Sequence, residues 1–95
     1  MLTLPVKKKW YDMIASGEKT EEYREMKHYW TVRLFKAFRF IPGRTYIRIR
    51  NGYSTKDPTL LCLCQLGIGE GKPEWGAKPG VNYYVIKILK KTKEI

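Results

Sequence analysis

The sequence predicts a small α+β domain whose strands form a mixed sheet curled toward a barrel. The chain has 95 residues, which suffices for one domain over positions 1–95, and its 43% hydrophobic and 14% aromatic content supplies a packed interior. Two segments in the first half have apolar residues at helical spacing, whereas the second half contains segments with strand-like alternation. Together these observations favour strands with two interspersed helices.

A strand and a helix are predicted at the start of the chain. Residues 2–6 are expected to form a short strand that ends near Pro5. Residues 8–16 have apolar side chains at i, i+3 and i+4, which form one stripe on a helix. These side chains are Trp10, Met13 and Ile14. Gly17 follows, and a glycine takes the left-handed conformation that commonly ends a helix.

A polar strand and a second helix are predicted next. Lys19–Glu25 is a strand candidate in which nearly every residue is polar. Lys27–Phe38 is predicted to be a helix with Arg33 and Lys36 directed outward. Its buried stripe is Trp30, Leu34, Phe35 and Phe38. Pro42-Gly43 then marks a turn.

The second half is predicted to be mostly sheet. Alternating apolar and basic residues over Tyr46–Arg50 are typical of a half-buried strand, and the apolar run Leu60–Ile68 is typical of a central one. Cys62 and Cys64 are expected to be buried on one face of that strand. The other predicted segments are a loop over Tyr53–Pro58, a glycine-rich loop over Gly67–Gly80, a final strand over Val81–Leu89 and a frayed tail over Lys90–Ile95.

The charge of the chain is strongly positive and unevenly distributed. Its 19 Lys and Arg residues outnumber its 9 Asp and Glu residues, for a net charge of +10. The segment from Met26 to Lys56 has no acid, and its basic residues are Lys27, Arg33, Lys36, Arg39, Arg44, Arg48, Arg50 and Lys56. This distribution predicts a polyanionic partner, and the charge alone leaves RNA, DNA and a free nucleotide open. The alternatives are a charge that only solvates the surface and a charge that binds a protein partner.

Composition also disfavours several classes of protein. No apolar run approaches the roughly 18–20 residues of a membrane helix, so we expect no membrane partner. The first residues are apolar and Lys7–Lys9 follow, which is the reverse of a secretory signal and favours a cytoplasmic location. Two cysteines are too few for a disulfide framework or a metal site. We therefore expect no metal and no cofactor.

The segment Gly17–Arg24 has the most informative pattern in the chain. Strand alternation places Glu22 and Arg24 on the same face, and Lys19 lies at the turn between helix and strand. Such groups can orient one another by ion pairs and bind a phosphate or a base edge. We therefore expect the three side chains to converge at the mouth of one concave site. The same pattern is also typical of an exposed edge strand that its charge keeps soluble.

The spacing Gly17-x-Lys19-x-x-Glu22-x-Arg24 resembles the G-x-K-x-x-E-x-R signature of the ASCH family. The helix end before it and the closing strand Gly80–Ile88 are also similar to that family, and the order of elements covers almost the whole chain. The resemblance implies a fold similar to the PUA domain, which is a mixed β-barrel of about five or six strands with two main helices. It also implies RNA or nucleotide binding in a cleft beside the motif.

The same resemblance includes an enzymatic alternative. Some ASCH proteins are N4-acetylcytidine amidohydrolases, and ribonuclease activity is ascribed to others. The motif lysine is catalytic in the amidohydrolases, which implies Lys19 as nucleophile or general base beside Glu22 and Arg24. Those enzymes have a threonine at the position of Glu22 and a further glutamate in an insertion that this chain lacks. Glu70 and Glu74 are the candidates for that second acid.

Two kinds of side chain are predicted to bind RNA or a nucleotide. Cations bind phosphates, and accessible aromatic rings stack on bases. The predicted cations are Lys19, Arg24, Arg33, Lys36, Arg39 and Arg44, of which the last four are expected to form one patch. The predicted stacking residues are Tyr23, Tyr53 and Trp75, whereas Trp10 and Trp30 are assigned to the core. Binding is favoured over hydrolysis because it requires no residue that the chain lacks.

Overall fold

The computed structural model describes residues 1–94 and has five strands and two α-helices in that range. The strands are β1 (Thr3–Val6), β2 (Glu21–Arg24), β3 (Arg44–Asn51), β4 (Thr59–Glu70) and β5 (Asn82–Glu94). The helices are α1 (Lys8–Ser16) and α2 (His28–Phe38), and a short 3-10 helix covers Pro73–Trp75. Each predicted helix and strand is present. Some boundaries differ: β2 covers Glu21–Arg24 and not the predicted Lys19–Glu25, and the changes in the second half are described below.

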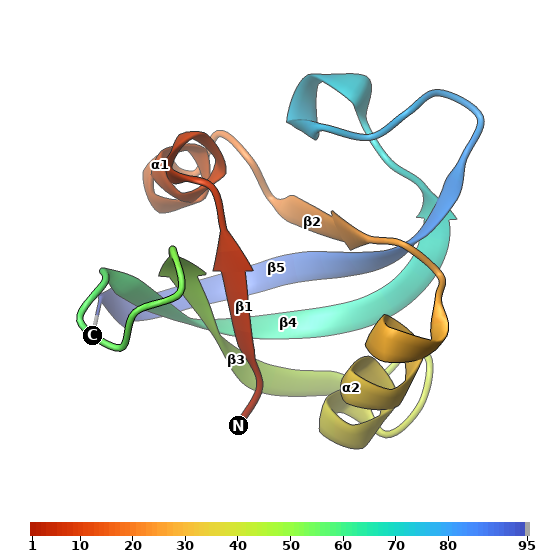
Figure 1. Cartoon of the computed structure of the whole chain (residues 1–95), viewed down its shortest axis with the longest axis horizontal. Coiled ribbons are helices and arrows are strands. Elements are labelled where there is room, and N and C mark those ends of the chain that lie inside the picture. The colour runs from red at the N-terminus through yellow and green to blue at the C-terminus, as the bar shows by residue number, and fades with distance from the viewer. Residues whose placement is uncertain (95) are drawn as a thin grey trace.

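The strands of this range form one sheet in the order β1-β3-β4-β5-β2. β1 is parallel to β3 and the other neighbours are antiparallel, so the sheet is mixed. The sheet curls into a half-barrel that brings the edge strands β1 and β2 in front of β4 and β5, with α1 and α2 at opposite corners of the molecule (Figure 1). The predicted α+β fold with a barrel-like mixed sheet is confirmed.

The main core is formed by the sheet and the two helices. Alternate side chains of β3 and β4 are buried over most of each strand, as expected where one face packs on a core. Cys62 and Cys64 are fully buried there, as predicted. A second, smaller cluster lies beside the motif and consists of Tyr23, Trp75, Ala77 and Tyr83.

The boundary predicted between β4 and the glycine-rich loop is wrong. A loop is expected from Gly67, but β4 continues to Glu70, which pairs with Asn82. Glycine weakens a strand only mildly, and the backbone hydrogen bonds to β5 outweigh that effect. The connection from β4 to β5 is therefore shorter than the sequence predicts.

The prediction of a frayed tail is also wrong for the part of it that the structure describes. β5 continues through Glu94, and Lys90 and Lys91 pair with Leu63 and Cys62 of β4. Two shifts in register keep β5 in the sheet over this stretch. Ile95, the last residue of the predicted tail, lies outside the described residues.

The end of α1 directs the chain into β2. Gly17 has a φ of 88°, and its N–H donates a 3.1 Å hydrogen bond to the carbonyl oxygen of Ile14. The N–H of Lys19 then donates to the carbonyl oxygen of Met13 at 3.0 Å. The predicted left-handed glycine is thus confirmed, and it sets where the motif begins.

Neither helix of residues 1–94 has the length and apolar content needed to span a bilayer.

Candidate functional site

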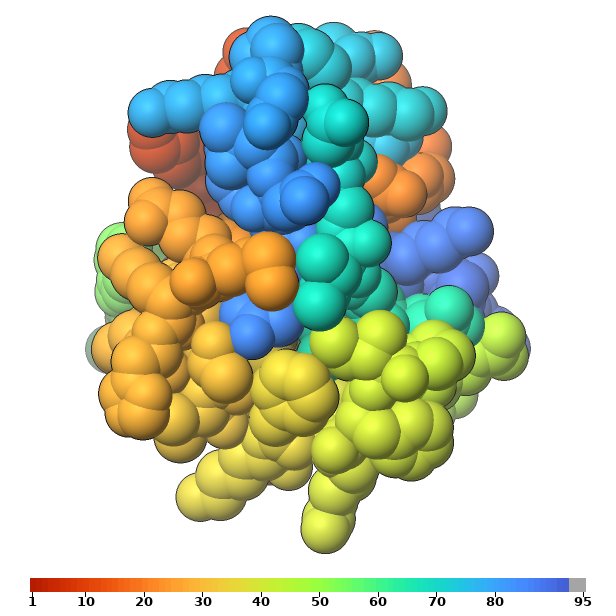
Figure 2. Space-filling model, turned by 90° about the vertical axis from the view of Figure 1, so that its right-hand side faces the viewer, coloured from red at the N-terminus to blue at the C-terminus, as the bar shows by residue number. Residues whose placement is uncertain are grey.

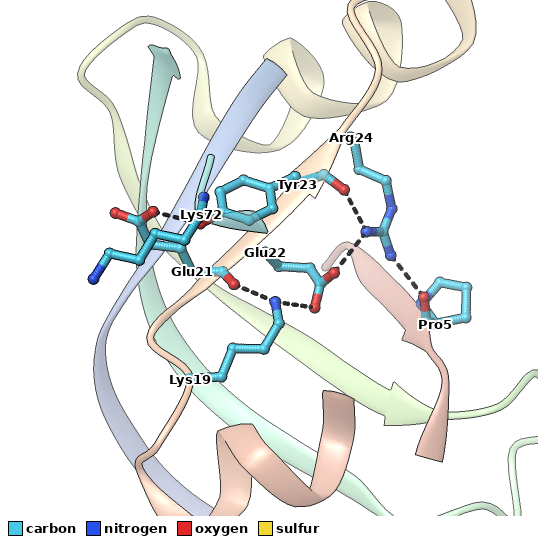
Figure 3. A network of polar contacts seen from close by, with 7 residues as sticks. All are labelled: Pro5, Lys19, Glu21, Glu22, Tyr23, Arg24 and Lys72. Atoms are coloured by element: carbon cyan, nitrogen blue, oxygen red, sulfur yellow. Dashed lines mark hydrogen bonds and ion pairs between the residues drawn. The ribbon is translucent and has the colours of Figure 1, made fainter. Parts of the chain in front are cut away.

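β2 is an edge strand whose side chains connect the two edges of the half-barrel. It pairs with β5, and Glu22 and Arg24 share one of its faces, as predicted. The guanidinium of Arg24 reaches β1, where Nη2 donates a 2.7 Å hydrogen bond to the carbonyl oxygen of Pro5 (Figure 3). Nη1 donates to Glu22 Oε1 at 3.1 Å and to the carbonyl oxygen of Tyr23 at 2.7 Å. Arg24 therefore links β2 to β1 through its side chain.

Lys19 is buried beneath this link. Its side chain is 0% exposed, and Nζ donates to Glu22 Oε2 at 3.0 Å and to the carbonyl oxygen of Glu21. The ring centroids of Trp10 and Tyr23 each lie 5.3 Å from Nζ. Burial lowers the pKa of Lys19, and the adjacent Glu22 carboxylate opposes that shift. Glu22 thus lies between two cations, the fully buried Lys19 and the partly buried Arg24.

Tyr23 connects β2 to the segment that joins β4 and β5. Its hydroxyl donates to Glu21 Oε1 at 2.8 Å and accepts a hydrogen bond from the N–H of Lys72 at 3.0 Å. Its ring packs with Trp75 and Tyr83. Burial raises the pKa of Tyr23 above its ordinary value of 10.0, so the phenol stays protonated at neutral pH.

A cleft of about 1210 Å³ opens beside the motif. Its walls come from β1, β2, the first turns of α1 and α2, and the segments 51–53 and 75–78. Among the described residues, seven aromatic side chains line it: Trp10, Tyr23, Tyr29, Trp30, Tyr53, Trp75 and Tyr83. The charged lining residues are Lys7, Lys8, Arg24, Arg33, Lys78, Glu22 and Glu25. Cations therefore outnumber acids in a cleft whose walls also carry seven aromatic rings.

One wall consists of two adjacent aromatic rings flanked by two guanidinium groups. The rings of Tyr29 and Trp30 meet edge-on, with centroids 4.9 Å apart and planes at 82°. The guanidinium carbon of Arg33 lies 3.5 Å from the Tyr29 centroid, and that of Arg24 lies 5.1 Å from the Trp30 centroid. Tyr29 is 50% exposed. This wall therefore offers a half-exposed tyrosine, with one face of its ring covered by Arg33, next to fixed positive charge.

The structure brings most of the predicted motif and stacking residues together. The predicted residues that line the cleft are Glu22, Tyr23, Arg24, Arg33, Tyr53 and Trp75. Lys19 contacts Glu22, but it is not among the lining residues, because its ammonium is enclosed by Glu22 and the two rings. The expectation that Lys19 lies at the mouth of the site is therefore wrong.

The four cations predicted to form one basic patch do not all lie together. Lys36 and Arg39 border a second groove, of about 580 Å³, which Arg33 also borders. Arg44 instead donates a 2.8 Å hydrogen bond from Nε to Gln65 Oε1, and it borders neither the cleft nor this groove.

The two acids proposed from the sequence as a second catalytic group lie outside the cleft. Glu70 Oε1 accepts a 3.1 Å hydrogen bond from the N–H of Gly80, and Glu74 is exposed on the short 3-10 helix. Neither is among the described residues that line the cleft. The acid at its rim is Glu25, whose carboxylate is 3.7 Å from Lys27 Nζ.

Sequence reasoning missed several lining residues. They are Lys7, Lys8, Trp10, Glu25, Tyr29, Trp30, Lys78 and Tyr83. Trp10 and Trp30 do pack against the main core, as predicted, but each also borders the cleft. The signal that points to them is their position: each tryptophan lies in the first turn of a helix that flanks the polar strand.

Within residues 1–92, whose side chains the structure describes, no three His, Cys, Asp or Glu side chains are grouped so as to hold a metal ion. Comparisons with protein-family models, with curated proteins and with solved structures give no match for this chain. The resemblance to the ASCH family therefore depends on the spacing of the motif and the order of the elements around it.

Proposed function

We propose that this chain is an RNA- or nucleotide-binding domain of the ASCH type, and that the cleft beside β2 is its binding site. The observation that most directly supports this proposal is the lining of the cleft by seven aromatic side chains together with cations. Stacking of a base on an aromatic ring contributes about 1–3 kcal/mol, and Lys and Arg side chains bind phosphates. A ligand with flat rings and negative charge fits such walls.

In this proposal the carboxylate of Glu22 is the group of the motif that accepts a hydrogen bond from the base. Each oxygen of the Glu22 carboxylate accepts one hydrogen bond from a neighbouring cation, Lys19 or Arg24. A carboxylate has roughly four acceptor sites, so Glu22 retains capacity for an amino or imino group of a base. The motif then presents an acceptor at the bottom of the cleft, while Arg33 supplies a donor at its rim.

The fluorescence of the protein gives a direct test. All three tryptophans of the chain line the cleft, so a stacked base is expected to quench their emission. We expect a single-stranded oligouridylate to quench it at low salt, and Tyr29→Ala to weaken binding about 5- to 150-fold, the equivalent of one stacking interaction. Phe40→Ala is the matched control, because Phe40 is 61% exposed and borders neither the cleft nor the second groove. Absence of quenching, or equal effects of the two variants, would contradict the proposal.

A small hydrolase is the second candidate, and the lowered pKa of Lys19 supports it. We rank it below binding because the Lys19 ammonium is hydrogen-bonded to Glu22 and Glu21 and does not line the cleft. The test is release of cytidine from N4-acetylcytidine, with cleavage of labelled RNA in parallel. Turnover by the wild type that is abolished in Lys19→Arg, at an unchanged melting temperature, would replace binding with hydrolysis, since guanidinium cannot act as base or nucleophile.

A further inference from the structure

We propose that the ligand is an extended single strand of several nucleotides, with bases in the cleft and backbone continuing through the second groove. This inference rests on the proposed function of the cleft and adds a second binding surface to it. The second groove lies between α2 and β3. It is bordered by Met1, Leu2, Arg33, Lys36, Ala37, Arg39, Thr45 and Tyr46.

The cleft and the second groove adjoin each other. Met1, Leu2 and Arg33 border both of them, so a strand that leaves the cleft over these residues reaches the second groove. Arg33 is fixed at this passage, because its guanidinium lies over the Tyr29 ring and Nη1 donates to the Tyr29 carbonyl oxygen at 3.0 Å. A guanidinium held there can bind the phosphate of a nucleotide whose base lies in the cleft.

The second groove differs from the cleft in its charge. Its charged side chains are Arg33, Lys36 and Arg39, and none of the described residues around it is acidic. Among the side chains that the structure describes, those of residues 1–92, neither Lys36 nor Arg39 forms an ion pair with an acid. Figure 2 shows long side chains of α2 and the segment after it, coloured yellow to yellow-green, projecting from the lower end of the molecule. Cations without acidic partners suit the phosphates of a strand, and Tyr46, 42% exposed, offers one further ring.

The backbone at Arg39 gives an independent indication that its side chain is used. Arg39 follows α2 with a φ of 79°, a conformation that favours glycine and that other residues rarely adopt. Strained backbone of this kind is typical of residues retained for function. Arg39→Gly removes the cation and relieves the backbone strain in one substitution. It should therefore weaken binding while raising stability, so the loss of binding cannot be attributed to a loss of stability.

A single strand fits this arrangement better than a free nucleotide or a duplex. A free nucleotide would occupy only the cleft, so the cations of the second groove would have no phosphate to bind. Bases in a duplex are stacked on one another, so they cannot also stack on the rings of the cleft. The structure thus assigns the cleft to unpaired bases and the second groove to the backbone beyond them.

The test compares a uridine dinucleotide with a uridine decanucleotide over a range of salt concentrations. We expect the decanucleotide to bind more tightly and with a steeper dependence of log affinity on log salt. The Lys36→Ala/Arg39→Gly variant is expected to reduce that slope by about 1.4, at roughly 0.7 for each phosphate that is no longer neutralised, and to leave dinucleotide affinity unchanged. Arg39→Gly alone is expected to raise the melting temperature while weakening binding of the decanucleotide.

The control is Lys87→Ala/Lys90→Ala, which removes two exposed cations of β5 that border neither the cleft nor the second groove. Equal slopes for the control and the Lys36/Arg39 variant, or equal affinity for the two oligonucleotides, would overturn the inference. The cleft proposal would survive that result if the dinucleotide still quenched tryptophan fluorescence and Tyr29→Ala weakened its binding. Absence of binding by either oligonucleotide would overturn both.

Discussion

Replacing Glu22 by Gln tests whether this carboxylate stabilises the half-barrel by neutralising Lys19. The substitution preserves the shape of the side chain but leaves the Lys19 ammonium, which is 0% exposed, without its anionic partner. Removing one partner of a buried ion pair costs about 3–5 kcal/mol. The carbonyl oxygen of Glu21 and two aromatic rings still contact Nζ, so we expect the lower end of that range, about 3 kcal/mol.

Thermal unfolding followed by circular dichroism measures this effect. A chain of this size has an unfolding free energy of about 5–14 kcal/mol, so the variant is expected to fold at 25 °C. Its melting temperature should be lower by about 12–24 °C, at roughly 4–8 °C for each kcal/mol. Glu25→Gln is the control, because Glu25 pairs with Lys27 at the surface, where such pairs contribute about 0–1 kcal/mol. Lys19→Met/Glu22→Gln should recover part of the loss, because it removes the unpaired buried charge.

The pH dependence provides a second criterion. Burial lowers the pKa of Lys19 in the folded state below its ordinary 10.5, so between these values the unfolded chain binds more protons and stability rises with pH. Without the Glu22 carboxylate the folded-state pKa of Lys19 falls further, and the window begins at lower pH. The deficit of Glu22→Gln relative to wild type should therefore shrink as pH rises from about 7 to about 10. A deficit below about 1 kcal/mol, or one that grows with pH, would refute the reasoning.

Two further predictions concern packing and thiol reactivity. Gly71→Ala should destabilise the fold by about 1–3 kcal/mol in thermal melts, because a Cβ there lies 2.7 Å from Ala77 Cβ and from the Tyr23 ring. Gly69→Ala, whose Cβ meets nothing within 4 Å, should change little. Burial raises the pKa of the Cys62 thiol to about 11, so both cysteines should react with a disulfide reagent at about pH 8 slowly in buffer and rapidly in urea. Equal rates in the two solvents would show that the thiols are accessible in the folded protein.

Periodicity was sufficient to predict the helices and the interiors of the strands. The stripe that contains Trp10 and Ile14 is the buried side of α1, and Gly17 ends that helix with the positive φ expected of it. The ends of β4 and β5 were not predictable in this way. They depend on pairing between strands, such as that of Glu70 with Asn82, which outweighs the local effect of glycine and lysine.

The burial of Lys19 and the identity of the residues that line the cleft depend on contacts between segments that are distant in the sequence. Nothing near Arg24 in the sequence indicates that its guanidinium binds Pro5, which is 19 residues away. Periodicity identifies Trp30 as facing the core, but it does not say that an edge of the same ring borders a cleft. The ion pair of Lys19 with Glu22 was anticipated from the sequence, but Lys19 was expected at the mouth of the site, because its enclosure by the rings of Trp10 and Tyr23 arises only when α1 packs beside β2.

The spacing of the motif has a structural explanation that is independent of any reaction. Gly17 ends α1, Lys19 lies beneath the strand, Glu22 joins the two cations and Arg24 links β2 to β1. The four residues together therefore hold the edges of the half-barrel and form one side of the cleft. Lys19→Arg places a larger group in a space with 0% exposure, so it is expected to lower both stability and nucleotide affinity even if the domain only binds. Loss of function in that variant consequently indicates catalysis only when the melting temperature is unchanged.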